Sequence, residues 1–355
     1  MASSMWRSGV FLCLCACGHG PSAVHEAAPS KVTAHYTVTN SDNFRGALVR
    51  VCLEGGPVRA LVPIDGRVGA RVRGASLDGD ALDIRDDRII LRDSVGTDCI
   101  DYATRFERSW LPNHGSSALV VSQAQWLWRP KPFPESFDAS VRFVLPSGTR
   151  AALPWPQAGG VYLPDRSAFF ADTYTVFGAF EVRNFSIADT DVEVVHLGAL
   201  PSDAAVRRWL DRAMRAAASI GPFPRDRVQF VLTPVEVSDD DAVFGMLRRG
   251  GGASILLVPS TNATREGLDR DWVAVQELSH LWLPRFHPRD RWISEGIATY
   301  LQEVLRARCG FQTETRAWER LAEGFERGRR SGTGRSLTAE SRDMDRTGAY
   351  HRVYW

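Results

Sequence analysis

The sequence is nearly free of lysine and of net charge. Lys31 and Lys131 are its only lysines, and 43 basic against 42 acidic residues leave a formal net charge of +1. The arginines are scattered along the chain rather than gathered in one block, which is typical of a solvated surface. Because a near-neutral charge balance offers nucleic acid no basic footprint, we expect no nucleic-acid partner.

The N-terminal leader lacks a hydrophobic run long enough to cross a membrane. Its apolar run, Val10–Ala16, follows a basic residue and is typical of a signal peptide. The letters LCAC at 14–17 resemble the lipobox of bacterial lipoproteins, in which the cysteine carries lipid. We therefore expect a signal peptide over 1–17, lipid on Cys17, a flexible tether over 18–31 and export to the bacterial cell envelope. An uncleaved or wrongly assigned N-terminus is the alternative.

Cysteine spacings of the metal-binding kind are absent. Six cysteines are present, and three of them lie in the leader. Cys52 and Cys99 fall in the β-rich half and could pair in the oxidising space that export provides. Cys309 would then be left alone on a helix, where it is interpreted as a small buried apolar residue.

The 355 residues, 44% of them hydrophobic, are enough for two domains with separate cores. From about 32 to 198, short runs of β-branched and aromatic residues are separated by Gly, Pro, Asp and Asn, with no helical pattern between them. This predicts an N-terminal domain over 32–198 that forms an antiparallel β-sandwich or saddle. The aromatic and proline cluster at 126–137 is interpreted as a packed interdomain corner rather than a binding loop.

After residue 198 the pattern changes, and we predict an α+β domain over 199–355. SDAAVRRWLDRAMRAAASIG, at 202–221, has a Ser/Asp cap and an apolar stripe at helical spacing. Two strands follow, RDRVQFVLTPVE and ASILLVPS, separated by the glycine-rich loop MLRRGGGA. Further helices are predicted at about 269–283, 294–309 and 313–330. The chain ends at GAYHRVYW with neither a polar tail nor a helix stop signal, which predicts a domain cut in its middle.

The residues that point to chemistry lie in VAVQELSHLW, at 273–282. Positions i and i+4 of a helix share a face, so Gln276 and His280 point the same way, with Glu277 beside them. A working zincin has the pattern H-E-x-x-H, in which two imidazoles bind Zn²⁺ and the Glu accepts a proton from a water whose pKa the metal lowers to about 7. Here Gln276 stands where the first His is expected. Glu295, at the start of the next predicted helix, is a candidate for a further ligand.

A second motif, WISEGIATY at 292–300, fits the pattern W-[LV]-[NS]-E-G-[FIL]-A-x-Y at nearly every position. Together the two motifs resemble those of the gluzincin metallopeptidases, which include the aminopeptidase N, glycyl aminopeptidase and peptidase-MA-like families. The resemblance extends over about 170–355. It implies a β-domain followed by an incomplete thermolysin-like α+β catalytic domain, and an aminopeptidase-like hydrolysis of peptide bonds in an extended substrate.

The resemblance also implies roles for individual residues. The ligands of the zinc ion would be His280, Glu295 and, at the degenerate position, Gln276. Glu277 would be the general base, and the hydroxyl of Tyr354 would stabilise the oxyanion. Tyr350 is the second candidate for that tyrosine, and half-buried packing is the alternative role for either one.

The sequence departs from the family in four places: the residue at 276, the substrate-binding segment, a short connector from His280 to Glu295, and the early end of the chain. A carboxamide oxygen is a weaker zinc ligand than imidazole, so Gln276 predicts a large loss of zinc affinity. The family's aminopeptidases carry a glutamate that grips the free amine of the substrate, on the strand before the zinc helix. Here the matching substrate-binding segment is Gly251, Gly252 and Ala253, without a glutamate. Backbone pairing with an extended peptide would survive, whereas recognition of an N-terminal amine would not follow.

Two functional hypotheses therefore stay open. The first is a zinc-dependent, aminopeptidase-like peptidase whose activity is weakened. The second is a non-catalytic lipoprotein that binds peptides or protein partners in the old cleft. A damaged or truncated gene product is a third interpretation. Without the second motif, Glu277 and His280 would be an ordinary helix-surface pair and Glu295 a favourable charge at a helix N-terminus.

Overall fold

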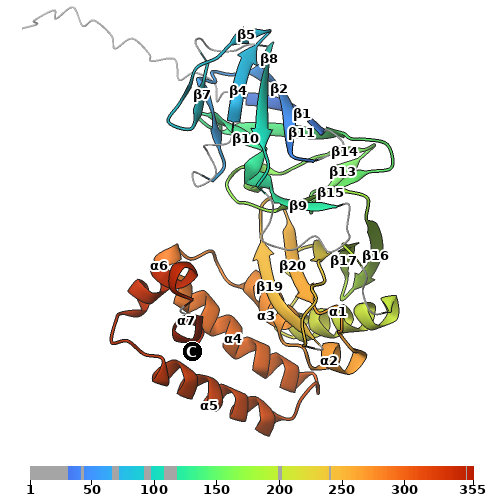
Figure 1. Ribbon diagram of the computed structural model, residues 1–355, viewed down its shortest axis with the longest axis vertical. Helices are drawn as coiled ribbons and strands as arrows, with labels where there is room; N and C mark the ends of the chain where they lie inside the picture. Colours follow the sequence, from blue (N-terminus) through green and yellow to red (C-terminus); the bar gives the residue numbers. More distant parts are fainter. Residues whose placement is uncertain are drawn as a thin grey trace, which may run out of the picture.

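A computed structural model describes residues 31–40, 44–65, 72–91, 97–107, 118–198, 202–239, 241–348 and 350–355. The chain forms a β-rich part and a second part in which helices pack on a sheet, as Figure 1 shows in blue to green and in yellow to red. The predicted signal peptide and Cys17 lie outside the described residues. The mixed α+β fold class predicted from the sequence is confirmed.

The largest sheet of the β-rich part has eight strands in the order β13-β14-β11-β1-β2-β8-β4-β5. Their bounds are β1 (Lys31–Asn40), β2 (Gly46–Gly55), β4 (Val72–Leu77), β5 (Asp80–Ala81), β8 (Thr97–Arg105), β11 (Ser136–Val144), β13 (Gln157–Ala158) and β14 (Val161–Tyr162). Side chains of β1 are buried at every second position, which is the period of a strand with one face on the core. Most pairs are antiparallel as predicted, but β1 and β11 run parallel.

Two smaller sheets complete the β-rich part, in the orders β10-β3-β7-β6 and β12-β15-β9. Their strands are β3 (Ala60–Pro63), β6 (Ile84–Arg85), β7 (Arg88–Ile90), β9 (Leu119–Ser122), β10 (Trp128–Lys131), β12 (Arg150–Ala152) and β15 (Tyr174–Gly178). Trp126, Trp128 and Trp155 are at most 1% exposed, and they belong to one hydrophobic cluster with β1 and β2. The aromatic segment predicted as a packed corner therefore lies in the core of the β-rich part.

Cys52 and Cys99 form a disulfide. They lie directly opposite each other on β2 and β8, so the register of the sheet brings their side chains together. Among the described cysteines, Cys309 is the free one, and it is half-buried at the end of a helix.

The second part is built on a five-stranded sheet in the order β16-β17-β18-β20-β19. Its strands are β16 (Glu181–Ile187), β17 (Thr190–His196), β18 (Arg227–Leu232), β19 (Ala242–Arg248) and β20 (Ala253–Pro259). The three central strands run parallel, and β16 and β19 are antiparallel edge strands. The sheet thus takes in two strands that lie before the predicted boundary at residue 198.

Strand β19 corrects the sequence-based expectation of a loop before the glycine run. The segment from Ala242 to Arg248 pairs with β20 from Pro259 back to Ser254. Its glycine and its arginine weaken the local strand pattern, and pairing with the buried β20 makes it a strand.

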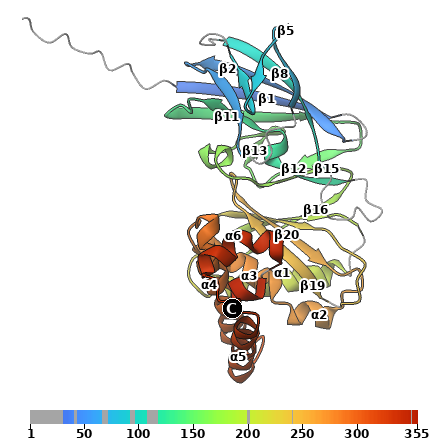
Figure 2. The same ribbon diagram turned by 60° about the vertical axis from the view of Figure 1, so that its left-hand side comes forward.

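The helices are α1 (Asp203–Ala218), α2 (Arg265–Arg270), α3 (Val273–Ser279), α4 (Arg291–Arg308), α5 (Glu314–Arg330), α6 (Leu337–Thr347) and α7 (Tyr350–Tyr354), with 3₁₀ turns at His280–Trp282 and Pro288–Asp290. Figure 2 shows them gathered beside the five-stranded sheet. In the described part of the chain, no helix has the length and apolar character needed to span a membrane.

The helix predicted over 269–283 is divided into α2 and α3 by Asp271. This residue has an extended backbone (φ −56°, ψ 144°) and ends α2. Its carboxylate accepts hydrogen bonds from the backbone N–H groups of Val273 and Ala274, at 3.1 and 3.0 Å. Asp271 therefore stops one helix and caps the next, which is the helix that carries the QELSH motif.

Candidate functional site

Helix α3 lies between edge strand β19 and helix α4, so residues from all three meet. The close approach of β19 depends on Gly245. A Cβ atom added there would lie 2.6 Å from Glu277 Cγ and 2.6 Å from Val273 Cγ1. Glycine inside a strand often marks such a close approach of two backbones.

We expect Gly245→Ala to destabilise the protein by about 1–3 kcal/mol, because a methyl group would be forced into a filled space. Urea unfolding of the variant measures this. Gly74→Ala, on β4, is the matched control, because a Cβ atom added at Gly74 would meet nothing within 4 Å. Equal stability of the two variants would show that β19 does not press on Glu277.

His280 and Glu295 face each other across α3 and α4. His280 Nε2 lies 3.4 Å from Glu295 Oε2, and both side chains are largely buried. The other ring nitrogen, Nδ1, lies 3.4 Å from the hydroxyl of Ser294. Burial alone would lower the pKa of His280, but the hydrogen bond to Glu295 and the charges of Glu277 and Glu295 outweigh it and raise this pKa.

Glu277 binds the edge strand rather than pointing into open solvent. Its Oε2 accepts a hydrogen bond of 2.8 Å from the backbone N–H of Leu247 on β19. Burial, followed by the nearby charge of Glu295, raises the pKa of Glu277 to about 7, although His280 and the Leu247 N–H act in the opposite direction. The carboxyl group is therefore close to half protonated near neutral pH.

The raised pKa of Glu277 predicts how the stability of the protein depends on pH. The folded protein holds the Glu277 proton above the ordinary pKa of 4.5, so its free energy of unfolding falls as the pH rises from about 4.5 to about 7. We expect Glu277→Gln to remove about 3 kcal/mol of that fall, because a neutral amide does not ionise and each pKa unit corresponds to about 1.4 kcal/mol. Urea titrations between pH 4.5 and 8 measure it. Glu319→Gln, at a position 53% exposed, should leave the wild-type profile unchanged.

Tyr354 is brought close to the same group of residues by α7. Burial is the main cause that raises the pKa of its phenol, and the charges of Glu295 and Glu277 raise it further. The second candidate, Tyr350, packs edge-on against Tyr354 with 6.0 Å between ring centres, and it is 45% exposed. The charges of Glu295 and Glu277 therefore act on the phenol of Tyr354.

Gln276 is buried, 3% exposed, one helical turn before His280. Two ligands of a tetrahedral zinc ion with bonds of about 2.0–2.1 Å lie about 3.4 Å apart, so the spacing of His280 and Glu295 suits one metal ion. The third protein donor would be the neutral carboxamide of Gln276, which binds zinc weakly. Within the described residues, no group of three or more His, Cys, Asp or Glu side chains could hold a metal ion. The donor set therefore does not fit a tight zinc site.

Gly251, Gly252 and Ala253, predicted to bind substrate, lie at the seam between the two parts of the chain. A Cβ on Gly251 would lie 2.5 Å from Trp155 Nε1, and one on Gly252 would lie 2.6 Å from the Pro154 carbonyl oxygen. Ala253 is completely buried. The strand whose backbone binds Glu277 is β19, through Leu247.

Sequence reasoning missed Arg249, which fixes the backbone around His280. Its guanidinium donates to the His280 carbonyl and, at 2.9 Å, to the Leu283 carbonyl. These carbonyls follow the end of α3, where helix carbonyls lack partners within the helix. The only local signal was an arginine next to a glycine run, which does not reveal its partners.

No family model matches the chain, and no curated protein matches its sequence. Its fold is similar to an aminopeptidase N family protein from Idiomarina loihiensis, with a TM-score of 0.70 and 14% identity over 90% of this chain and 65% of that one. An M1 zinc metallopeptidase from Deinococcus radiodurans gives a TM-score of 0.53 and 18% identity over 92% of this chain and 80% of that one. A mutant of that enzyme bound to a Tyr-Ser-Ala substrate gives a TM-score of 0.52 and 17% identity, with the same coverage.

At these identities the likeness shows the fold. The chain has the β-rich part followed by the helical part that resembles the N-terminal and part of the catalytic domain of M1 metallopeptidases. It spans 65% of the length of the Idiomarina protein.

Proposed function

We propose that this protein binds extended peptides along the free edge of β19, beside a metal site that has lost one of its three strong ligands. The observation that carries the proposal is the donor set. One imidazole, His280, and one carboxylate, Glu295, are paired with each other, and a buried carboxamide occupies the third position. Such a set favours binding over metal-dependent hydrolysis.

The edge of β19 offers backbone groups to a peptide. The N–H of Leu247 points away from β20, where it donates to Glu277, so a peptide would have to displace that carboxylate to bind it. Because backbone groups alternate along a strand, the N–H and C=O of Gly245 point the same way. Val243 and Met246 on this strand are 40% and 37% exposed. An extended peptide adding to an exposed sheet edge is a common mode of recognition. A metallopeptidase of similar fold has been seen with the tripeptide Tyr-Ser-Ala.

The test uses a displayed random peptide library, from which the tightest binder is synthesised in three forms. One form is unmodified, and each of the other two carries N-methyl groups at alternate residues, which removes the N–H donors along one edge or along the other. We expect N-methylation on one edge to weaken binding at least tenfold, and methylation on the opposite edge to have a smaller effect. Equal affinity of all forms would rule out strand addition.

A weak zinc peptidase is the second candidate, favoured by the 3.4 Å between His280 and Glu295 and by the pKa of about 7 of Glu277. In that case His280, Glu295 and Gln276 would hold zinc, which would supply a Lewis acid. Glu277 would serve as general base and Tyr354 as oxyanion donor. Zinc binding by the wild type, with peptide hydrolysis lost in Glu277→Gln, would favour this candidate.

We also propose that the protein is exported and, through Cys17, attached by lipid to the bacterial envelope. The disulfide between Cys52 and Cys99 supports an oxidising compartment. Mass spectrometry of the protein isolated from membranes would detect the lipid, and Cys17→Ser should release it into the soluble fraction. Equal membrane recovery of this variant would contradict the anchor.

A further inference from the structure

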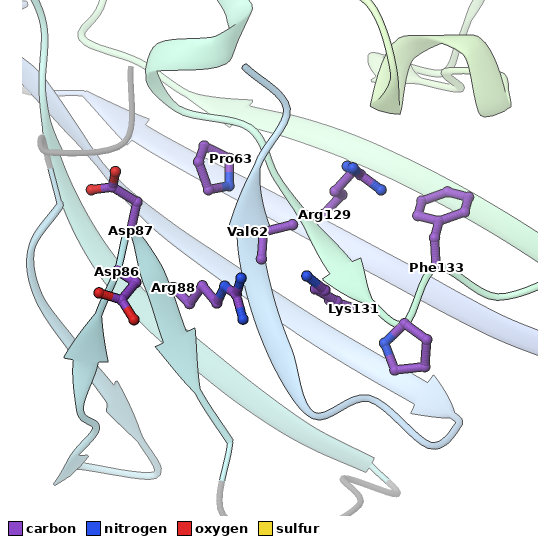
Figure 3. Close-up of a pocket in the computed structure, with 9 residues that line it drawn as sticks. Val62, Pro63, Asp86, Asp87, Arg88, Arg129, Lys131 and Phe133 are labelled. Carbon is purple, nitrogen blue, oxygen red and sulfur yellow. The ribbon is translucent and has the colours of Figure 1, made fainter. Parts of the chain in front are cut away.

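A depression of about 380 Å³ lies on the small sheet β10-β3-β7-β6, in the β-rich part and away from the peptidase-like site (Figure 3). Its walls are Val62, Pro63, Asp86, Asp87, Arg88, Arg129, Lys131, Pro132 and Phe133. Four of these residues are apolar, three are cations and two are carboxylates.

The three cations come from two strands that flank β3, on one face of the sheet. Arg129 lies opposite Val62 in the β10–β3 pair, and Lys131 lies two residues further along β10. In the β3–β7 pair Leu61 lies opposite Ile89, so Arg88 continues the register opposite Val62. Residues opposite each other share a face, and the two outer strands are separated by about 9.6 Å, two strand spacings.

The depression has three cations and two carboxylates in its walls, so its net charge is positive. Among the described residues, no carboxylate forms a salt bridge with Arg88, Arg129 or Lys131. Arg50, by contrast, is paired with Asp101 at 2.8 Å.

Arg129 is held in place with part of its hydrogen-bonding capacity unused. Its guanidinium carbon lies 4.7 Å from the ring centre of Phe170 and 5.8 Å from that of Phe133. Its Nε is buried and has no hydrogen-bond partner. Because the Nε is buried, a ligand would be bound by the terminal guanidinium nitrogens, whose position the aromatic packing restricts.

We infer that this depression binds a phosphate-type oxyanion through Arg88, Arg129 and Lys131. A phosphate group has three or more acceptor oxygens and can accept hydrogen bonds from several cations at once, whereas a carboxylate is matched by one arginine. Figure 3 shows Asp86 and Asp87 at the opposite end from Arg129 and Lys131. The phosphate group would therefore bind at the end formed by Arg129 and Lys131. Asp86 and Asp87 would accept hydrogen bonds from a hydroxyl or ammonium group of the same ligand.

The test titrates the full chain with inorganic phosphate by calorimetry and, separately, with phosphatidylglycerol vesicles by co-sedimentation. We expect saturable binding that Lys131→Met weakens about tenfold, the loss of one charge-assisted hydrogen bond. Lys31→Met is the matched control. It removes the only other lysine, which is exposed and paired with Asp138 on another sheet, and it should leave binding within twofold of wild type.

The two probes separate the sources of the phosphate. Binding of inorganic phosphate identifies a soluble ligand, and binding of vesicles alone identifies a lipid headgroup, provided that Lys131→Met weakens either one more than Lys31→Met does. Arg129→Gln should lose affinity as well, with its unfolding midpoint measured alongside. No saturable binding of either probe, or equal losses in the two lysine variants, would overturn the inference.

Discussion

Gln276→His is expected to tighten zinc binding on the order of 100-fold, because even residues that only orient a zinc ligand change affinity by about 10- to 100-fold when mutated. The new imidazole would lie one helical turn before His280, the spacing at which two histidines bind one ion. His280 and Glu295 already lie 3.4 Å apart for the same ion. Competition with a chromogenic chelator measures the affinity of both proteins.

The control for this experiment is Gln157→His, which adds a histidine at an exposed position on β13. It should bind zinc no more tightly than wild type. If Gln276→His also leaves the affinity unchanged, then the side chain at 276 does not face His280 and Glu295, and the assignment of the three ligand positions is wrong.

Asp271→Ala is expected to lower the free energy of unfolding by about 3 kcal/mol, since it combines the loss of a helix cap with an unpaired buried donor. The carboxylate is 6% exposed and accepts from the indole N–H of Trp209 on α1 at 2.8 Å. It also accepts from the N–H groups of Val273 and Ala274. Without it, α1 and the start of α3 would lose a shared partner. Urea unfolding of the variant measures the loss.

Asp269→Ala is the matched control, two residues away. Asp269 pairs with Arg208 and Arg212 nearer the surface, where such a pair contributes at most about 1 kcal/mol. If Asp271→Ala costs no more than this control, water replaces the lost acceptor and Asp271 does not fix the position of α3.

The elements that the sequence predicted well have strong local signals. The β-branched run near residue 32 and the cap of the segment 202–221 correspond to β1 and α1 in the structure. The helical spacing of QELSH and the WISEGIATY motif led to Glu277, His280 and Glu295, which the structure brings together. Those residues lie near each other in sequence, so few long-range contacts had to be foreseen.

What the sequence did not reveal depends on partners far along the chain. β19 is a strand because it pairs with β20. Glycine is required at 245 because α3 packs closely against this strand. The sequence analysis placed Gly251 and Gly252 in a substrate-binding segment. In the structure they pack against Trp155 and Pro154, about a hundred residues earlier in the sequence. Arg249 likewise binds carbonyls after α3 that no local pattern identifies.

The central claim is that the wild-type chain binds peptides without holding a zinc ion for their hydrolysis. The most direct test equilibrates purified protein with micromolar zinc, measures bound metal by mass spectrometry, and incubates the same sample with the selected peptide. We expect far less than one zinc per chain, and a peptide recovered intact from its complex. One zinc per chain, together with cleavage of the peptide that Glu277→Gln abolishes, would contradict the account.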